Sequence, residues 1–454
     1  MLPSVFGISG IRGIVGTDLT PETARFIGRG FGAFIGPGAV AVGRDARPSG
    51  EALEAAVVEG LRAAGCRVEL LGICPTPTVL HRARAGSFRG AIVITASHNP
   101  EEWNGFKLVG GDGMFLAPGR VAEFRASIER DAVSAPAPPE PGTADRYGDA
   151  VRDHVEAVAS NELFSDIPRQ LAGRRIRVGV DAVNGAAAGA GQEIVRRLGA
   201  EPVGLFCSND PGELRAGFPR RPEPTEENLV ALGALVKREG LDFGVGFDPD
   251  GDRAGFVDET GTPLGEEATI CLACRYVLAR RPGKVVVNLS TTRAVEDVCA
   301  DFSSPVERAP VGEAAVVERM KATGAVLGGE GNGGVILPAV NFTRDGIVAT
   351  ACVLGLVAAP GAGLSARRGE LPAYRMRKVK LAFSRARLME RRARLEQEFA
   401  GTDRDERDGL RFAGPDYWVH IRASNTEPAV RVIAERKGGG SPDDLIERAR
   451  RALE

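Results

Sequence analysis

Lysine is scarce in this sequence. Only seven of the 58 basic residues are lysine, and the first 236 positions contain a single one, Lys107. The 60 acidic residues slightly outnumber the basic ones, which gives a formal net charge of −2 and a pI near 6.2. A chain without an excess of positive charge lacks the field that attracts nucleic acid, so we expect no nucleic-acid partner.

Cysteines and long apolar runs are few as well. The seven cysteines are scattered among apolar segments, which favours reduced thiols over a disulfide framework. Cys271 and Cys274 have CxxC spacing, but the sequence has no second pair to complete a zinc site, and we interpret them as core residues of a helix over 266–281. No apolar run approaches the roughly 20 residues of a membrane helix, and the N-terminus lacks the order of a signal peptide. We therefore expect a cytoplasmic protein without membrane contact.

The chain is too long for one hydrophobic core, since it has 454 residues. A unit of strand, polar turn, helix and strand recurs at residues 39–71, 177–206 and 284–306. Such units are typical of doubly wound α/β domains. The sequence therefore predicts three tandem α/β domains.

A different pattern follows a break at 358–363. It predicts a strand at 374–381, a helix at 385–399, a strand pair around Ile421 and Val432 and a last helix, which together form a smaller α+β domain. We expect α/β architecture throughout, with three doubly wound domains and this C-terminal domain arranged around one central cleft. The expected domain limits are 1–148, 149–257, 258–368 and 369–454.

The segment D-P-D-G-D-R, from Asp248 to Arg253, is the first candidate for chemistry. Its three carboxylates repel each other unless a cation lies among them, although a solvated acidic turn has the same pattern. An EF-hand is disfavoured because Arg253 stands where that loop needs glycine and because the flanks, 243–247 and 254–257, are strand-like. A tight triad with few ligands suits Mg²⁺, so phosphate chemistry becomes the hypothesis.

Ser97 and Lys107 form the second candidate. A buried strand over 90–96 ends in the polar loop S-H-N-P, where a hydroxyl lies beside His98. The G-x-S-x-G elbow of a serine hydrolase is absent, which disfavours acyl transfer. A lysine kept in an arginine-rich chain hints at proton transfer, because arginine does not lose its proton. A plain loop serine and an ordinary surface lysine remain the alternatives.

Two further loops carry ligand-binding groups. Near the C-terminus, the loop at 422–428 and Arg431 offer hydroxyls, an amide, backbone N–H groups and guanidinium donors that suit a phosphate, although a capped hairpin turn would look similar. The glycine-rich segment 328–334 contains Glu330 and Asn332, which could grip vicinal hydroxyls of a sugar; a flexible hairpin is equally compatible.

These four motifs together resemble the α-D-phosphohexomutase family, which includes phosphoglucomutase/phosphomannomutase and phosphoglucosamine mutase enzymes. The resemblance spans essentially the whole chain, with one motif in each expected domain. Many members have Ser and His in the sugar loop where this chain has Asn332 and Gly334, and this form is similar to the archaeal-type phosphoglucosamine mutase branch.

The resemblance implies roles for specific residues. It assigns catalysis to Ser97 as the phosphoserine, His98, Lys107, Arg12 and Arg253. It assigns the metal to Ser97, Asp248, Asp250 and Asp252. It assigns substrate binding to Glu330, Asn332, Gly312, Arg422, Ser424, Asn425, Thr426 and Arg431.

The implied activity is the interconversion of hexose 6-phosphate and hexose 1-phosphate through a bisphosphosugar. Mg²⁺ and a hexose 1,6-bisphosphate activator are the implied cofactors, and glucosamine 6-phosphate is the expected substrate. A phosphomannomutase/phosphoglucomutase of broad specificity, a metal-dependent sugar phosphatase and a non-catalytic binding protein are the alternatives. We expect a monomer or homodimer.

Overall fold

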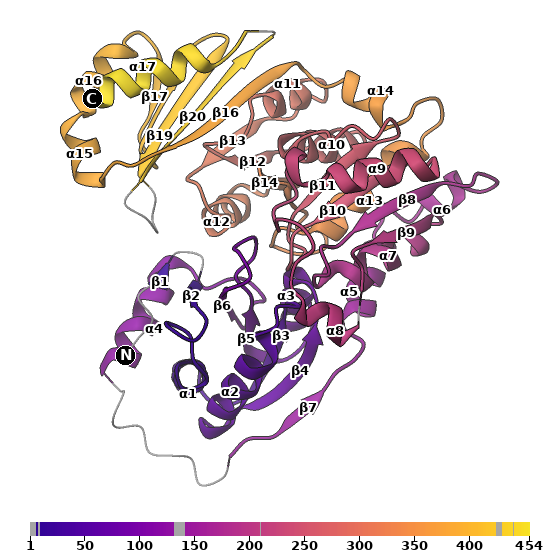
Figure 1. Ribbon diagram of the computed structural model, residues 1–454, viewed down its shortest axis with the longest axis vertical. Helices are drawn as coiled ribbons and strands as arrows, with labels where there is room; N and C mark the ends of the chain where they lie inside the picture. The colour runs from indigo at the N-terminus through magenta and orange to yellow at the C-terminus, as the bar shows by residue number, and fades with distance from the viewer. Residues whose placement is uncertain (1–5, 8–9, 131–140, 209, 424–428, 439) are drawn as a thin grey trace.

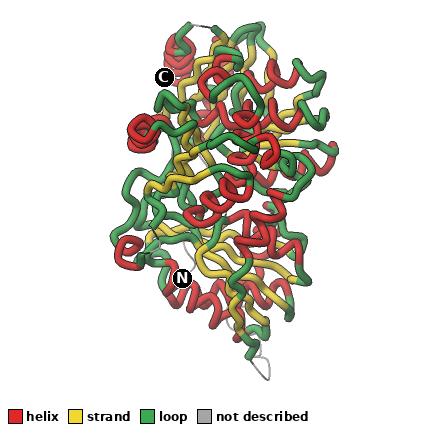
Figure 2. The backbone as a smooth tube through the Cα atoms, turned by 90° about the vertical axis from the view of Figure 1, so that its right-hand side faces the viewer, coloured by secondary structure: helices red, strands yellow, loops and turns green. Residues whose placement is uncertain are grey.

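Four β-sheets follow one another along the chain and organise the fold (Figure 1). The structure, a computed structural model, describes every residue except 1–5, 8–9, 131–140, 209, 424–428 and 439. In Figure 1 the first sheet lies at the bottom, the fourth at the upper left, the third beside it at the upper centre and the second at the right. Helices flank the sheets, as the red segments of Figure 2 show. The predicted architecture of three α/β units and a smaller α+β unit is confirmed.

The first sheet has the strand order β1-β2-β6-β5-β3-β4-β7. Its strands are β1 (Phe6–Gly7), β2 (Gly10–Ile14), β3 (Ala39–Arg44), β4 (Arg67–Ile73), β5 (Phe88–Ile94), β6 (Trp103–Gly110) and β7 (Ala144–Arg146). The accompanying helices are α1 (Pro21–Ile35), α2 (Gly50–Ala63), α3 (Thr76–Ala85) and α4 (Pro118–Arg130). The predicted unit at 39–71 is therefore β3, α2 and β4.

The second sheet has the order β11-β10-β8-β9 and the third β13-β12-β14-β15. The strands are β8 (Arg177–Asp181), β9 (Glu201–Leu205), β10 (Phe243–Phe247), β11 (Ala254–Asp258), β12 (Val285–Asn288), β13 (Val306–Ala309), β14 (Leu327–Glu330) and β15 (Gly334–Ile336). The helices are α5 (Ala150–Ala159), α6 (Ile167–Gln170), α7 (Ala187–Arg197), α8 (Pro211–Arg215), the 3-10 helix η1 (Glu226–Asn228), α9 (Val230–Glu239), α10 (Glu266–Leu278), α11 (Ala294–Ala300), α12 (Glu313–Thr323), α13 (Gly346–Ala358) and α14 (Leu364–Gly369).

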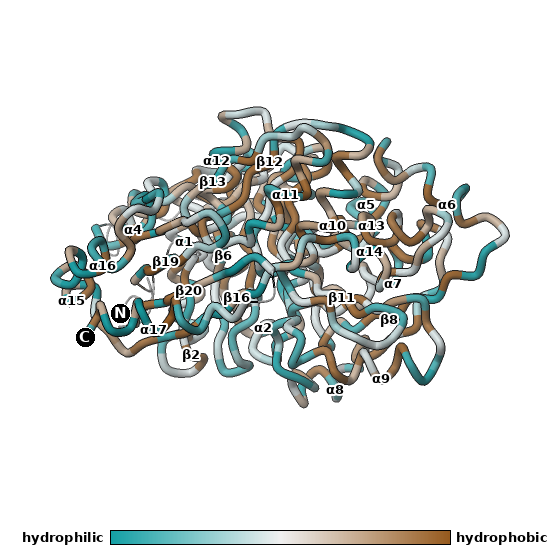
Figure 3. Tube along the Cα trace, turned by 90° about the horizontal axis from the view of Figure 1, so that it is seen from above, coloured by the Kyte–Doolittle hydropathy of each residue, from teal (hydrophilic) through white to brown (hydrophobic). Residues whose placement is uncertain are grey.

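The second and third sheets share one hydrophobic core. A single cluster of buried side chains runs from Val155 in α5 to Leu364 in α14. Helix α13 is apolar on all sides and almost wholly buried, which is expected of a helix packed between two layers. Figure 3 shows brown, apolar segments gathered around α10 and α13. The two sheets therefore form one packed body, whereas the first and fourth have cores of their own.

The same four-strand arrangement occurs in each of the first three sheets. A central strand (β3, β8 or β12) pairs in parallel with the next strand on one side and with a third strand on the other. The third strand then turns into an antiparallel partner. Consequently the loops 95–102, 248–253 and 331–333 occupy equivalent places at the carboxyl ends of β5, β10 and β14. Three of the four predicted motifs lie in these loops.

The fourth sheet is antiparallel, with the order β16-β20-β19-β18-β17. Its strands are β16 (Tyr374–Leu381), β17 (Asp403–Asp405), β18 (Leu410–Ala413), β19 (Tyr417–Ala423) and β20 (Val430–Lys437), and its helices are α15 (Arg385–Glu390), α16 (Arg392–Glu398) and α17 (Asp443–Leu453). The single helix predicted at 385–399 is wrong, because the chain breaks at Arg391 into two short helices.

Buried polar contacts join the first three sheets. Thr76, at the start of α3, donates from N and Oγ1 to the backbone O and Oδ2 of Asp250, at 2.8 and 2.6 Å. Thr78 Oγ1 lies 2.9 Å from His154 Nδ1 in α5, and His154 Nε2 lies 2.8 Å from Asp345 Oδ2 at the start of α13. These contacts fix α3 and the 248–253 loop relative to each other.

All seven cysteines are free, and Cys271 and Cys274 lie buried in α10 as core residues. None of the helices in the described part of the chain combines the length and the apolar character that a bilayer span requires.

Candidate active site

Three carboxylates face one another in the turn of the β10–β11 hairpin. Asp248, Asp250 and Asp252 are fully buried, and one ligand atom from each lies within 4.8 Å of the others. Gly251, with φ +67°, allows the tight turn between them. Burial, followed by the charges of Asp250 and Asp252, raises the pKa of Asp248 well above its ordinary value. A divalent cation would relieve this repulsion, so the triad could hold a metal ion.

The open oxygens of the triad show how a cation would fit. Asp250 Oδ1 and Asp252 Oδ1 are buried and have no hydrogen-bond partner among the described residues. The opposite oxygens are occupied, since Lys107 Nζ lies 2.6 Å from Asp250 Oδ2 and 3.2 Å from Asp252 Oδ2. Leaving a buried carboxylate oxygen unpaired is unfavourable, and hard cations such as Mg²⁺ take oxygen ligands of this kind. The residues present therefore fit such an ion.

Ser97 lies directly against the triad. Its Oγ donates a hydrogen bond to Asp248 Oδ2 at 3.2 Å, although 151 positions separate the two residues in the sequence. Its backbone has φ +52°, which is uncommon for a residue with a side chain and indicates a strained position. Ser97 N donates to Thr95 Oγ1 at 2.8 Å, which helps to hold this conformation.

Arg47 fixes the rest of the Ser97 loop. This fully buried guanidinium donates to the backbone oxygens of Ser97, Asn99, Pro100 and Trp103, at 2.6, 2.8, 2.6 and 3.0 Å. Asp45 balances its charge through an ion pair at 3.0 Å. Because every donor has an acceptor, the loop is held as a rigid unit.

Two arginines lie near the triad and the Ser97 loop. Arg253 Nη1 donates to Glu223 Oε1 at 2.8 Å, and its Nε lies 3.9 Å from Asp248 Oδ2 and 3.7 Å from Asp252 Oδ1. Arg12 Nη1 donates to the Asn99 side chain at 2.8 Å. Burial is the main cause that lowers the pKa of Arg12 from its ordinary value. Arg253 therefore lies beside the triad, and Arg12 contacts the loop that follows Ser97.

The two candidates for proton transfer differ in their surroundings. His98 Nδ1 is buried without a hydrogen-bond partner among the described residues. The charge of Arg253, followed by burial, lowers the pKa of His98 well below its ordinary value, so the ring is neutral. For Lys107, burial alone would lower the pKa, but Asp250 and Asp252 raise it overall.

Glu330, at the end of β14, is held by four donors. Its Oε1 accepts from Asn288 Nδ2 at 2.8 Å and from Gly312 N at 3.1 Å. Its Oε2 accepts from Arg344 Nη1 at 2.7 Å and from Asn332 Nδ2 at 3.4 Å. The structure thus brings three predicted sugar-binding residues together around one carboxylate.

Arg422 and Arg431 lie directly opposite each other on β19 and β20. Like charges in this arrangement destabilise a sheet, although Arg422 has a partner in Asp408, whose Oδ2 lies 3.0 Å from its Nε. A bound phosphate would compensate both charges. The predicted residues Ser424, Asn425 and Thr426 lie outside the described residues.

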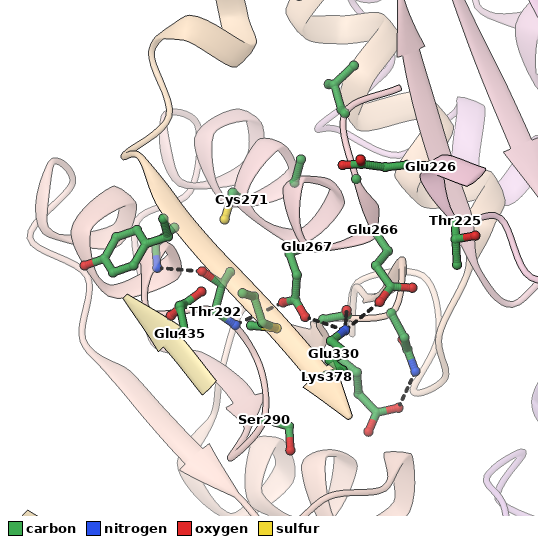
Figure 4. Close-up of a pocket in the computed structure, with 18 of the residues that line it drawn as sticks. Thr225, Glu226, Glu266, Glu267, Cys271, Ser290, Thr292, Glu330, Lys378 and Glu435 are labelled. Carbon is green, nitrogen blue, oxygen red and sulfur yellow. Dashed lines mark hydrogen bonds and ion pairs between the residues drawn. The ribbon is translucent and has the colours of Figure 1, made fainter. Parts of the chain in front are cut away.

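A cavity of about 1330 Å³ connects these groups. His98, Arg253, Glu330 and Arg422 all line it, so each of the four sheets contributes at least one predicted residue, and Asn332 and Arg431 line it as well. Figure 4 shows the part of the cavity around Glu330, where Lys378 reaches from β16 towards α10. Ser97, Lys107, Arg12 and the triad are not part of its lining.

Profiles of known families match four consecutive segments of the chain. They are described as phosphoglucomutase/phosphomannomutase alpha/beta/alpha domains I, II and III and the C-terminal domain, and they match residues 3–133, 152–261, 266–374 and 378–451. The chain belongs to the phosphoglucomutase/phosphomannomutase family. The resemblance seen in the sequence motifs is confirmed, and the chain is a phosphohexomutase, an intramolecular phosphotransferase that acts on a hexose phosphate.

Individual relatives of this phosphohexomutase match over its whole length. A protein of Methanopyrus kandleri named probable phosphoglucosamine mutase is 35% identical over 467 residues, which cover 99% of this chain and 98% of that protein. A protein of Thermococcus kodakarensis named phosphoglucomutase/phosphomannomutase is 34% identical, with 99% and 98% covered. The solved structure of a family protein from Burkholderia thailandensis gives a TM-score of 0.86 at 30% identity, covering 100% of this chain and 98% of that one.

Three residues of the phosphohexomutase site were missed in the sequence. Arg47 and Glu223 stand in segments without a motif, and no local signal could have found them. Arg344 had a weak signal, because it precedes Asp345, the N-cap of the wholly apolar helix α13. An arginine next to such a helix must find buried partners.

The phosphohexomutase also has a buried histidine where the third and fourth sheets meet. His420 Nε2 lies 2.6 Å from the Asp408 carbonyl oxygen and therefore carries the hydrogen, while Nδ1, 2.8 Å away, accepts from Ser290 Oγ. Burial lowers the pKa of His420 to about 4. The neutral ring satisfies both contacts, with Ser290 Oγ as the donor to Nδ1.

We expect this histidine to make stability depend on pH. An unfolded His420 binds its proton near pH 6.5, whereas the folded one does so only near pH 4, so its contribution is complete above pH 6.5 and is lost as the pH falls towards 4. The loss amounts to about 3 kcal/mol at most. The thermal midpoint of the wild type should fall more between pH 7.5 and 5.0 than that of His420→Gln, measured by calorimetry. Equal falls would contradict this assignment.

Proposed function

We propose that this phosphohexomutase moves phosphate between O6 and O1 of a hexose through a phosphoserine at Ser97 and a bisphosphosugar intermediate. The contact between Ser97 Oγ and Asp248 Oδ2, 3.2 Å long, carries the proposal, because it places a hydroxyl against a triad with two open oxygens. We propose Mg²⁺ as the cation, held by Asp248, Asp250, Asp252 and an oxygen of the phosphorylated Ser97. When bound, it would supply positive charge that polarises that phosphate.

The remaining groups around Ser97 would act on charge and on protons. In the first transfer, a sugar hydroxyl oxygen bonds to phosphorus as the Ser97 Oγ–P bond breaks, and the hydroxyl proton passes to His98, or to Lys107 once that ammonium has lost its own proton. Arg253 and Arg12 would offset the negative charge on the transferring oxygens. The second transfer is the reverse, with the other phosphate of the intermediate returning to Ser97.

The opposite side of the cavity would hold the substrate. We propose that Arg422 and Arg431, together with Ser424, Asn425 and Thr426, anchor the phosphate that is not transferred. Glu330 and Asn332, with Gly312, would bind the sugar hydroxyls. The opposed arginines and the shared carboxylate described above support these assignments.

Glucosamine 6-phosphate is the substrate that we propose. The support is the name of the Methanopyrus kandleri relative, together with the Asn332 and Gly334 form of the sugar loop. The name of the Thermococcus kodakarensis relative supports a broad phosphoglucomutase/phosphomannomutase as the second candidate. The test is kcat/KM for glucosamine, glucose and mannose 1-phosphates, measured on one phosphorylated preparation primed with a hexose 1,6-bisphosphate. We expect a preference for glucosamine of about tenfold or more, and ratios near one would establish the broad enzyme.

The same preparation separates a mutase from a sugar phosphatase. A mutase converts the substrate without releasing inorganic phosphate, whereas a phosphatase releases phosphate in proportion to the substrate lost. We further propose a hexose 1,6-bisphosphate activator, a cytoplasmic location, a monomer or homodimer, and domains at 1–148, 149–257, 258–368 and 369–454.

A further inference from the structure

We infer that Arg344 is a positioning residue that joins the metal-binding loop to the sugar-binding loop, and that Gly334 admits its side chain. The inference rests on the proposed function and adds two residues to it. Gly334 ends the glycine-rich segment 328–334 and begins β15, whereas Arg344 follows the third sheet and belongs to none of the sequence motifs.

Arg344 bridges the two loops with separate nitrogens. Its Nη2 donates to Asp252 Oδ2 at 2.6 Å, and its Nη1 donates to Glu330 Oε2 at 2.7 Å. These carboxylates belong to different sheets and to different proposed subsites. Because the guanidinium is a rigid plane with a fixed angle between its donors, a shift of one carboxylate must be accommodated by the other.

Glu313 fixes both the backbone and the base of the Arg344 side chain. Glu313 Oε1 accepts from Arg344 N at 2.9 Å, and Glu313 Oε2 lies 3.2 Å from Arg344 Nε. The next residue, Asp345, caps α13 and contacts His154 in the junction of the three sheets. The guanidinium therefore extends from a rigid base, which is the condition for a side chain to set the distance between two loops.

Gly334 leaves the space that the stem of Arg344 occupies. A Cβ at position 334 would lie 2.3 Å from Arg344 Cδ, 2.8 Å from Arg344 Cγ and 3.1 Å from Asn332 Oδ1. The backbone at Gly334 is ordinary strand, since its φ is not in the left-handed region. Glycine is thus required here for the room it leaves to Arg344 and not for its conformation.

A bridge of this kind links the occupancy of the two subsites. A sugar hydroxyl that bonds to Glu330 alters the hydrogen bond between Glu330 and Arg344. Because the same guanidinium also bonds to Asp252, the contact with Asp252 changes as well. The affinity of the triad for a cation and the affinity of the sugar loop for substrate should then depend on each other, and this dependence is reciprocal.

The test measures that dependence by calorimetry on unphosphorylated protein. Mn²⁺ is titrated with and without saturating glucosamine 6-phosphate, and the ratio of the two affinities gives the linkage. We expect Arg344→Lys, which keeps the charge but cannot hold both carboxylates in one plane, to reduce the linkage by about fivefold or more. The kcat/KM should also fall by about 10- to 100-fold, as for other residues that orient metal ligands.

Gly334→Ala tests the same bridge without changing any charge. It should reduce the linkage in the wild-type background, because the new methyl group displaces Arg344. In an Arg344→Ala background, where Cγ and Cδ are absent, the same substitution should change the linkage by less than about twofold. This pair of results keeps the test valid even if Arg344→Lys folds poorly.

Arg82→Lys is the matched control. Arg82 also grips a carboxylate with two nitrogens, at 2.6 and 3.0 Å from Glu69, but it contacts none of the proposed site residues. Its substitution should leave the linkage unchanged. Unchanged linkage in both Arg344→Lys and Gly334→Ala would overturn the inference. Failure of wild-type protein to bind any hexose phosphate would instead overturn the proposed function.

Discussion

Ser97→Ala should abolish mutase activity, with kcat lowered by at least about 10,000-fold, because the covalent acceptor of the phosphate is gone. Intact-mass analysis should show one phosphate on wild-type protein incubated with a hexose 1,6-bisphosphate and none on the variant. Ser97 has 1% exposure, and its hydroxyl is bonded only to Asp248 within the described residues, so removal of the oxygen leaves the fold unaltered.

The control for this substitution is Ser160→Ala. Ser160 caps helix α5, and its hydroxyl donates to the Glu156 carbonyl oxygen on the surface. It should retain wild-type activity and phosphorylation. If Ser97→Ala kept full activity while remaining unphosphorylated, the phosphoserine relay would be wrong, and phosphate transfer would have to use another group.

Asp250→Asn should weaken cation binding by at least about 100-fold and lower kcat/KM by at least about 1,000-fold. The substitution removes a full charge from the triad and replaces one carboxylate oxygen with a donor, which cannot ligate a cation. Mn²⁺ titration followed by calorimetry measures the first effect, and steady-state kinetics the second. Treatment of the wild type with a chelator should give the same loss, reversed by added Mg²⁺.

Asp242→Asn is a control on the same strand. Asp242 stands just before β10, at the end of the strand opposite to the triad, and accepts a hydrogen bond from Arg177 N at 2.7 Å, which an amide oxygen also accepts. We expect wild-type cation affinity. Activity that survives both Asp250→Asn and chelation would exclude a role for the triad in catalysis.

Most of the fold could be predicted because its signals are local. Short apolar runs separated by polar turns indicate the three strand-helix-strand units and the strands of the C-terminal domain. The observed strands begin within a few residues of the predicted ones. The break at Arg391 could not be seen, since residues 385–399 contain neither glycine nor proline. The shared core of the second and third sheets depends on how whole helices pack, which no single segment encodes.

The residues of the candidate site also fall into those that a local sequence pattern indicates and those that only the structure shows. Asp248 stands in a turn with three closely spaced carboxylates, and Ser97 stands in a polar loop directly after an apolar strand. Both patterns can be recognised in the sequence alone. Arg47 and Arg344 act on partners that are distant in sequence, and an arginine in an arginine-rich chain carries no signal. The residues that we propose to perform chemistry could therefore be found from the sequence, whereas the residues that hold them in place could not.

The grip of Arg47 on the Ser97 loop limits how the reaction cycle can proceed. Four backbone oxygens between Ser97 and Trp103 are tied to one guanidinium that has no exposed surface to move into. In the proposed mechanism the side chain of Ser97 gains and loses a phosphoryl group in every turnover, yet its loop has no freedom to follow either end of the sugar. The reorientation between the two half-reactions thus falls to the small molecule, and the cavity must be wide enough for a bisphosphorylated ring to turn without escaping.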